Sequence, residues 1–141
     1  MGRWVLDGDT PLPQTHFLGA LEGAAITGHL SLKVQPVTLG DGVTPVAGPD
    51  GVDLREAFVQ TFAIDEDQRR RGLGRALQQA GLVLAADLGC YQMRSWSSAD
   101  RTANYALKIG LNFAIQPGTH TTPDGSEIYG VFFIKTLERE T

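Results

Sequence analysis

The segment from Phe62 to Leu77 constrains the fold more than any other part of the sequence. An apolar run ends at Ile64, a polar segment follows, and from Gly72 onward apolar residues recur at spacings of three and four. This spacing places them on one face of a helix, which Gly89 is expected to end. The segment therefore predicts a strand that passes through a glycine-containing turn directly into a helix.

The start of this predicted helix has the features of a phosphate site. Its first backbone N–H groups have no acceptor within the helix, and the helix dipole favours an anion there. Gly72 and Gly74 lack a Cβ, so a pyrophosphate can approach the backbone closely. The cations that can add charge-assisted contacts are Arg69, Arg70, Arg71 and Arg75. The alternative is a solvated charge run with glycines that only form the turn, but three consecutive arginines oppose the dipole unless an anion is bound.

The rest of the chain alternates between strand and helix patterns. A loop rich in Gly, Pro and Asp is expected over residues 35–53, and Gly28 is expected to mark a bulge. On the strand Arg55–Ile64, three apolar residues are expected to share one face: Phe58, Phe62 and Ile64. The remaining expected elements are strands Trp4–Leu6, Phe17–Leu21, Ala25–Val34, Cys90–Trp96, Leu111–Ile115 and Glu127–Leu137, and a helix Arg101–Ile109.

From the first hairpin onward, the expected order is β-β-β-α-β-α-β-β. Hairpins combined with strand–helix–strand crossovers predict a mixed sheet with helices packed on it, an α/β (α+β) fold class. The length of 141 residues fits one domain over 1–141.

Composition excludes several classes of function. The formal net charge of −4 gives no general attraction to nucleic acid or to an anionic membrane, and the longest apolar run is too short to span a bilayer. One cysteine allows no intrachain disulfide, which agrees with a cytoplasmic location. The three histidines are scattered, so no metal site is expected.

Residues 64–77 read Ile-Asp-Glu-Asp-Gln-Arg-Arg-Arg-Gly-Leu-Gly-Arg-Ala-Leu. This run resembles the acetyl-CoA motif of the GNAT N-acetyltransferase superfamily. That motif is Arg or Gln, two residues, Gly, one residue, then Gly or Ala, and it follows a strand that ends in Val or Ile five residues upstream. Arg69, Gly72, Gly74 and Ile64 match it in register.

A second resemblance lies in the helix Arg101–Ile109, whose family counterpart often ends Glu-Lys-x-Gly-Phe. Lys108, Gly110 and Leu111 match that ending. Together the resemblances extend over about residues 16–137. They imply a GNAT-like, mostly antiparallel twisted sheet.

Two departures from the family pattern are visible. The family begins with a strand and two helices that wall the acceptor site, and only fifteen residues precede the hairpin here, so these helices are expected to be reduced or absent. Many members carry a Tyr four residues before the Gly of the second helix, where this chain has Ala106. Tyr105 is adjacent, but one residue is about 100° around a helix, so its side chain is expected to point elsewhere.

The resemblance implies an enzyme that transfers an acetyl group from acetyl-CoA, without a metal, to a primary amine of a small molecule or peptide by direct attack. The residues expected to bind coenzyme A are Phe62, Ala63, Ile64, Arg69, Arg70, Arg71, Gly72, Leu73, Gly74, Arg75 and Lys108. A backbone N–H near residues 62–64 is expected to stabilise the charge that develops on the thioester oxygen.

The general base and acid are less defined by the sequence. Glu56 is the expected base, because it lies on the strand that leads to the motif, with Asp100 and Glu22 as alternatives. Tyr129 is the expected acid, with Ser98 and Tyr105 as alternatives.

Two other functions remain open from the sequence. The first is a non-catalytic acyl-CoA-binding module, a sensor or subunit, which the missing helices and Ala106 favour. The second is a module that binds another phosphate ligand such as a nucleotide, although no Lys-Ser/Thr follows the glycines as in a P-loop. A homodimer is expected, because a small domain that lacks one wall often covers its exposed sheet with a partner.

Overall fold

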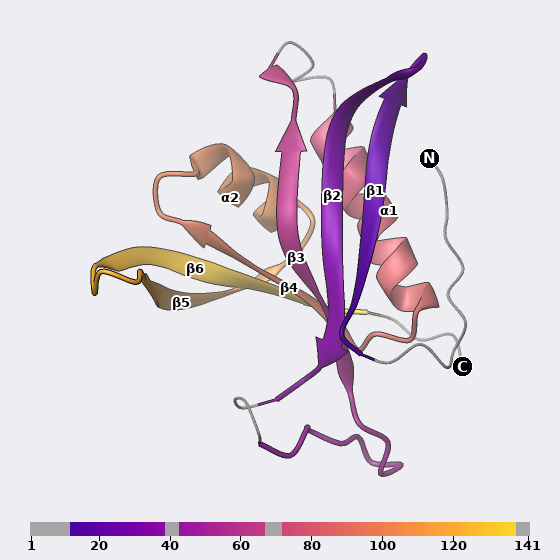
Figure 1. Ribbon diagram of the computed structural model, residues 1–141, viewed down its shortest axis with the longest axis vertical. Helices are drawn as coiled ribbons and strands as arrows, with labels where there is room; N and C mark the ends of the chain where they lie inside the picture. Colours follow the sequence, from indigo (N-terminus) through magenta and orange to yellow (C-terminus); the bar gives the residue numbers. More distant parts are fainter. Residues whose placement is uncertain (1–11, 39–42, 67–71, 138–141) are drawn as a thin grey trace.

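The computed structural model describes residues 12–38, 43–66 and 72–137 as one sheet with two helices (Figure 1). The expected Trp4–Leu6 strand lies outside these residues. The elements, in chain order, are β1 Gln14–Glu22, β2 Ala25–Pro36, β3 Arg55–Ile64, α1 Leu73–Asp87, β4 Gln92–Ser98, α2 Thr102–Gly110, β5 Ala114–Thr121 and β6 Glu127–Thr136. This order confirms the one that the sequence predicts.

The six strands lie in the order β1-β2-β3-β4-β6-β5. Every neighbouring pair is antiparallel except β3 and β4, which are parallel because α1 makes the crossover between them. The expected mixed, mostly antiparallel α+β fold is therefore confirmed.

Both helices pack on the same face of the sheet. Gly81 of α1 lies so close to Leu30 of β2 that a Cβ there would be 2.5 Å from the leucine side chain. On α2, the Tyr105 ring packs edge-on against Phe133 of β6, with centroids 5.2 Å apart. Within the described residues the opposite face of the sheet carries no helix, and we call it the open face (Figure 1).

The core fills the space between the helices and the sheet. Fully buried side chains from β2, α1, β4 and β6 meet there: Leu30, Leu32, Val34, Leu77, Met93 and Phe133. Burying an aliphatic or aromatic side chain of this size contributes about 1.5–3 kcal/mol each. This core fixes the strands and helices that carry the site described below.

The two central strands pair over only part of their length. β3 and β4 are in register at Glu56–Gln92, Ala57–Met93 and Phe58–Arg94, and this pairing goes no further. Beyond it β3 continues toward α1 while β4 turns away with β6 (Figure 1). We call residues 56–58 with 92–94 the paired end, and residues 59–64 with 95–98 the splayed end.

A bulge in β3 lies where the strands separate. Leu32 of β2 pairs with Val59, but Ser31 pairs with Thr61, so Gln60 is the extra residue. The extra residue reverses the alternation of side chains along the strand. Phe58 therefore lies on the open face and Phe62 on the helix face, so the expectation that they share one face is wrong.

A second bulge lies in β2 opposite β1, with Thr27 as the extra residue beside Gly28, where the sequence places it. The expected strand Leu111–Ile115 is displaced. Leu111 and Phe113 are buried in the connection after α2, and β5 begins at Ala114 and runs through Pro117. β5 is an edge strand, and an edge tolerates a proline that a central strand would exclude.

Candidate functional site

The first turn of α1 has the backbone conformation expected of an anion site. Gly72 precedes the helix with φ 76°, in the left-handed region that favours glycine, and a Cβ there would meet no atom within 4 Å. No side chain caps the helix and no acidic residue lies in its first turn. Among the residues that the structure describes, no carboxylate of this turn therefore competes for its orphan N–H groups. The expected ligands Arg69, Arg70 and Arg71 lie outside the described residues.

Gly74 is the point where β3, α1 and α2 meet. A Cβ at this position would lie 3.4 Å from Phe62 Cζ, 3.7 Å from Leu107 Cδ2 and 3.9 Å from Ile64 Cγ1. Leu73 is half-buried beside it, and Ala63 is exposed on β3. Arg75 is exposed, with its guanidinium 3.7 Å from the position of a Cβ on Gly110, at the end of α2. The structure therefore brings together the expected residues of β3 and α1.

Lys108 is the exception among the expected ligands of coenzyme A. Its side chain is 1% exposed. Its Nζ donates hydrogen bonds to Gln78 Oε1 (3.1 Å) and Ser95 Oγ (3.3 Å) and lies 4.5 Å from the centre of the Phe113 ring. The ammonium is enclosed by these groups, which leaves no surface for a bound phosphate, so we correct its role to a structural one. Burial without a carboxylate lowers the pKa of Lys108 to about 8.

Several buried polar atoms at the splayed end lack hydrogen-bond partners among the described residues. They are Gln78 Nε2 on α1, Ser97 Oγ on β4 and Asn104 Oδ1 on α2. Such atoms are uncommon in native proteins, because each costs roughly 1–3 kcal/mol when unpaired. Gln78 and Ser97 are themselves closed off from solvent, so these atoms mark a polar and incompletely paired interior between the helices and the sheet.

Glu56 lies at the paired end and is held by three side chains. Its carboxylate accepts a two-pronged pair of hydrogen bonds from Arg94 (2.8 Å to Nη2, 3.1 Å to Nε), one from Gln35 (2.8 Å) and one from Gln92 (3.0 Å). Gln35, Glu56 and Gln92 are directly opposed on β2, β3 and β4. The sheet register itself therefore assembles this cluster.

This arrangement argues against Glu56 as the general base. Burial alone would raise the pKa of its carboxyl, but the hydrogen bonds from Arg94, Gln35 and Gln92 and the charge of Arg94 outweigh burial and lower it. Glu56 is also only 3% exposed. A carboxylate that is stabilised as the anion and closed off from solvent is a weak proton acceptor, so its expected role is corrected to a structural one.

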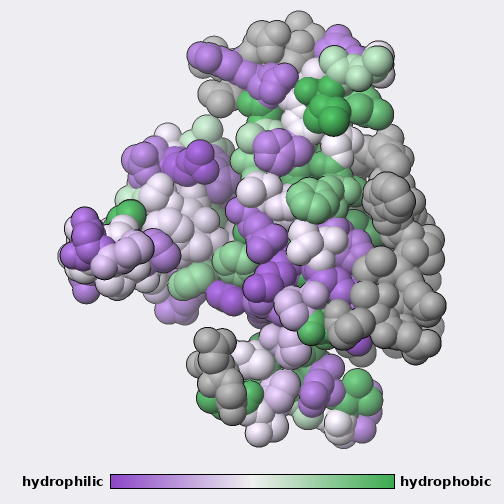
Figure 2. Space-filling view, viewed as in Figure 1, coloured by the Kyte–Doolittle hydropathy of each residue, from purple (hydrophilic) through white to green (hydrophobic). Residues whose placement is uncertain are grey.

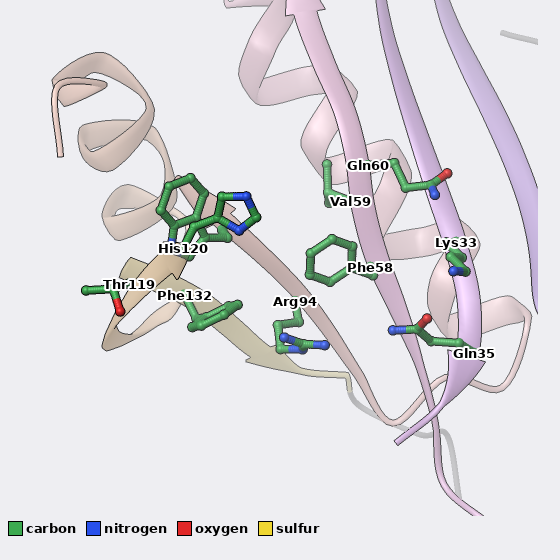
Figure 3. A pocket seen from close by; sticks show the side chains of 10 residues that line it. Lys33, Gln35, Phe58, Val59, Gln60, Arg94, Thr119, His120 and Phe132 are labelled. Carbon is green, nitrogen blue, oxygen red and sulfur yellow. The ribbon is translucent and has the colours of Figure 1, made fainter. Parts of the chain in front are cut away.

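A groove of about 540 Å³ lies on the open face, above the paired end and the start of the splayed end (Figure 3). Each of the five strands from β2 to β6 contributes side chains. The lining residues are Lys33, Gln35, Phe58, Val59, Gln60, Arg94, Trp96, Thr119, His120 and Phe132. Figure 2 shows that this face is largely polar at its centre, whereas exposed apolar residues lie near the tip of the β1–β2 hairpin, at Leu21 and Ile26.

Arg94 forms part of the groove floor. Its guanidinium lies between two aromatic rings, 4.8 Å from the centre of Phe58 and 5.2 Å from that of Phe132 (Figure 3). Its Nε and Nη2 are bound to Glu56, whereas Nη1 makes no hydrogen bond with any described residue. Arg94 is thus rigidly placed and still presents donor capacity to the groove.

Tyr129, the expected acid, is 70% exposed on the β5–β6 hairpin and does not line the groove. Tyr105 donates from its hydroxyl to the Ser97 carbonyl (3.2 Å), as expected for a side chain that does not replace the family tyrosine. Ala106, at the family position, is exposed.

His120 is not among the residues that the sequence predicts to be catalytic. Its ring lies 5.5 Å from that of Trp96 and lines the groove beside it. The Trp96 indole is fixed by donating to the Gly118 carbonyl at 3.2 Å. No periodic signal in the sequence marks His120, because only the pairing of β5 with β6 brings it to this face.

Among the described residues, no three His, Cys, Asp or Glu side chains are grouped in a way that could hold a metal ion. None of the described helices combines the length and the apolar character needed to cross a membrane.

Comparisons with known proteins agree on one family. The model of the acetyltransferase (GNAT) family matches residues 3–110. No curated protein sequence matches the chain significantly. Among solved structures, Arabidopsis thaliana NAA60 with a bisubstrate analogue superposes with a TM-score of 0.65 and 15% identity, covering 82% of this chain and 67% of that one.

Two further structures show the same fold. Arabidopsis thaliana NAA60 with acetyl-CoA has a TM-score of 0.63 and 14% identity, with 81% and 67% of the two chains covered. The ribosomal-protein-S18-alanine N-acetyltransferase of Escherichia coli has a TM-score of 0.60 and 21% identity, with 90% and 72% covered. At these identities the likeness concerns the fold.

Proposed function

The chain belongs to the GNAT acetyltransferase family, and on that premise we propose that it transfers an acetyl group from acetyl-CoA to a primary amine held in the open-face groove. The observation that carries this proposal is the splay between β3 and β4. It separates a helix start that suits a pyrophosphate from a groove that suits an acceptor.

The residues around the splayed end fit coenzyme A. Gly72 opens the first turn of α1 without a Cβ, and Gly74 keeps this turn close to Phe62 and Leu107. In our proposal the N–H groups of this turn bind the pyrophosphate, with Arg75 nearby.

Bound acetyl-CoA supplies an acetyl group activated as a thioester. The amine of the acceptor attacks the carbonyl carbon, and the thiolate of coenzyme A leaves. β4 no longer pairs with β3 beyond Phe58 and Arg94, and the Thr61 N–H is already bound to Ser31 Oγ (3.1 Å). In our proposal a backbone N–H of β3 at residues 62–63 donates to the carbonyl oxygen. The groove floor begins at Phe58 and Arg94, so an amine bound there approaches from the open face.

The amine must be neutral to attack, so a proton acceptor in the groove assists the reaction. Among the ten lining side chains, His120 is the one whose chemical type exchanges protons near neutral pH. We therefore propose His120 as the base in place of Glu56. His120→Asn should lower kcat/KM at pH 7 about tenfold or more, while acetyl-CoA binding stays unchanged.

The proposal is tested by incubating the protein with acetyl-CoA and a panel of amines, and by following free thiol release together with the mass of the products. Acetylation of at least one amine class is the expected result. Acetyl-CoA binding with no transfer to any amine would instead favour a non-catalytic acyl-CoA-binding module, which the alanine at position 106 makes a specific alternative.

A further inference from the structure

We propose that the acceptor is an amine that carries a carboxylate, such as a free amino acid, and that Lys33 and Arg94 bind this carboxylate in the open-face groove. This inference rests on the proposed function and names its substrate class. Three observations carry it: the charges of the groove, their spacing and the aromatic walls.

The groove is cationic although the protein is acidic. The chain has a formal net charge of −4, yet its ten lining residues include Lys33, Arg94 and His120 and no aspartate or glutamate. The carboxylate in contact with the lining is Glu56, which lies beneath Arg94 and is fully engaged by it and by two glutamines. An amine selected for its positive charge alone would meet repulsion here.

Lys33 has no partner in the part of the chain that the structure describes. No hydrogen bond or ion pair involves its ammonium, and its side chain is half-buried at the groove wall. Arg94 compensates Glu56, so the groove keeps about one net positive charge from Lys33. A single carboxylate matches this charge, whereas a phosphate dianion would exceed it.

The sheet register sets the distance between the two cations. Lys33 is opposite Phe58, and Phe58 is opposite Arg94, so the three side chains form one row across β2, β3 and β4 on the open face (Figure 3). Their outer Cα atoms are two strand spacings apart, roughly 10 Å. A small anion between them can accept from the free Nη1 of Arg94 and from Lys33 together.

The rest of the groove favours an apolar body on the acceptor. Phe58, Trp96 and Phe132 supply aromatic walls. The row of cations also lies at the last paired register before the splay, so a carboxylate bound there keeps the amine of an amino acid close to the splayed end. The groove therefore fits an amino acid with an apolar or aromatic side chain.

The test uses three amines that differ at one group: L-phenylalanine, L-phenylalanine amide and 2-phenylethylamine. Calorimetric titration into protein saturated with coenzyme A measures binding without turnover. L-phenylalanine should bind roughly tenfold more tightly than either analogue, as a hydrogen bond to a charged group predicts. Equal binding of the acid and the amide would overturn the inference.

A charge variant locates the effect. Lys33→Glu should weaken L-phenylalanine roughly tenfold or more and leave the amide within about twofold, so the preference is lost or reversed. Lys135→Gln is the matched control, because Lys135 is opposite Met93 on the other face of the sheet and does not line the groove. An acid preference that persists unchanged in Lys33→Glu would also overturn the inference.

Failure of this inference and failure of the proposed function give different results. If the protein does not bind coenzyme A when coenzyme A alone is titrated into it, the proposed function fails. If it binds coenzyme A and acetylates amines that lack a carboxylate as well as it acetylates amino acids, the proposed function stands and the carboxylate site is wrong.

Discussion

One charged side chain is buried at the paired end of β3 and β4 and another at the splayed end. The surroundings of Glu56 favour its charged form, whereas those of Lys108 favour its neutral form. At the paired end, Glu56 has a full counter-charge from Arg94 and two amide donors, and its pKa is lowered toward the anion. At the splayed end, Lys108 has neutral oxygens and an aromatic ring as partners, and its pKa is lowered to about 8, toward the neutral amine.

This difference separates a buried ion pair from the proposed coenzyme site. At the paired end, Glu56 and Arg94 compensate each other beneath the groove floor. The splayed end keeps an unbalanced ammonium, unpaired polar atoms on α1, β4 and α2, and a helix start without a cap. Substitutions at the paired end should therefore reduce stability, and substitutions at the helix start of the splayed end should reduce ligand affinity.

The largest effect is expected from Arg94→Met. The methionine can keep the contact with Phe58 and Phe132, but it leaves Glu56 buried without its counter-charge, which costs about 3 kcal/mol or more of the free energy of unfolding. Urea denaturation at pH 7 measures this loss.

Glu56→Gln is the complementary variant, and its cost should be smaller, about 1–2 kcal/mol. Arg94 is 29% exposed and can be hydrated when its partner is removed, whereas Glu56 at 3% exposure cannot. The stability from Glu56 is present above the usual pKa of a glutamate and is lost as pH falls through the lowered value, so Glu56→Gln should also flatten the acid limb of stability. Equal losses in the two variants would contradict the asymmetry.

The next largest effect concerns pH and Lys108. Its pKa is lower in the folded protein, about 8, than in the unfolded chain, 10.5, so the unfolded state binds more protons between these values. Stability should therefore rise with pH across this window, by up to about 3 kcal/mol from this group. Lys108→Met should remove the rise, which is measured as the difference between the variant and the parent in denaturation at pH 7.5 and pH 9.5. A parallel pH dependence in both proteins would show that Lys108 is not desolvated.

The smallest stability effect is expected from Gly72→Ala, about 1 kcal/mol, because φ 76° disfavours a Cβ while the surrounding space is open. Gly125→Ala is a matched control, since Gly125 has φ 88° and open space in the β5–β6 turn. Both variants should lose similar stability, but only Gly72→Ala should weaken acetyl-CoA binding. A comparable loss of affinity in Gly125→Ala would contradict the assignment of acetyl-CoA binding to the first turn of α1.

Local signals in the sequence predict most of the fold. The spacing of apolar residues predicts α1, a capping residue and the closing Gly110 predict α2, and β3 is predicted with the bounds that it has. Pro117 obscures β5, because a proline indicates a break unless the strand is known to be at an edge. Gln60 obscures the faces of β3, because the bulge depends on pairing with β2 rather than on a local residue pattern.

The helix start and the open-face groove likewise differ in how far they can be predicted from the sequence. The helix start is local, so Gly72 and Gly74 can be recognised from their spacing. The groove is assembled from five strands, and residues such as Lys33 and His120 come together only through sheet order and register. The residue type alone does not show whether a side chain can reach a ligand. Glu56 and Lys108 are chemically suitable site residues in the sequence, but both are buried in the structure.

Titration calorimetry of acetyl-CoA into the protein and into its Gly74→Asp variant tests the central claim most directly. The aspartate adds a carboxylate beside the first turn of α1, where the account places the pyrophosphate. We predict micromolar binding by the parent protein and its loss in Gly74→Asp, with the variant confirmed as folded by circular dichroism. No binding by the parent at millimolar acetyl-CoA, or unchanged affinity in the folded variant, would contradict the assignment of the splayed end as the coenzyme A site.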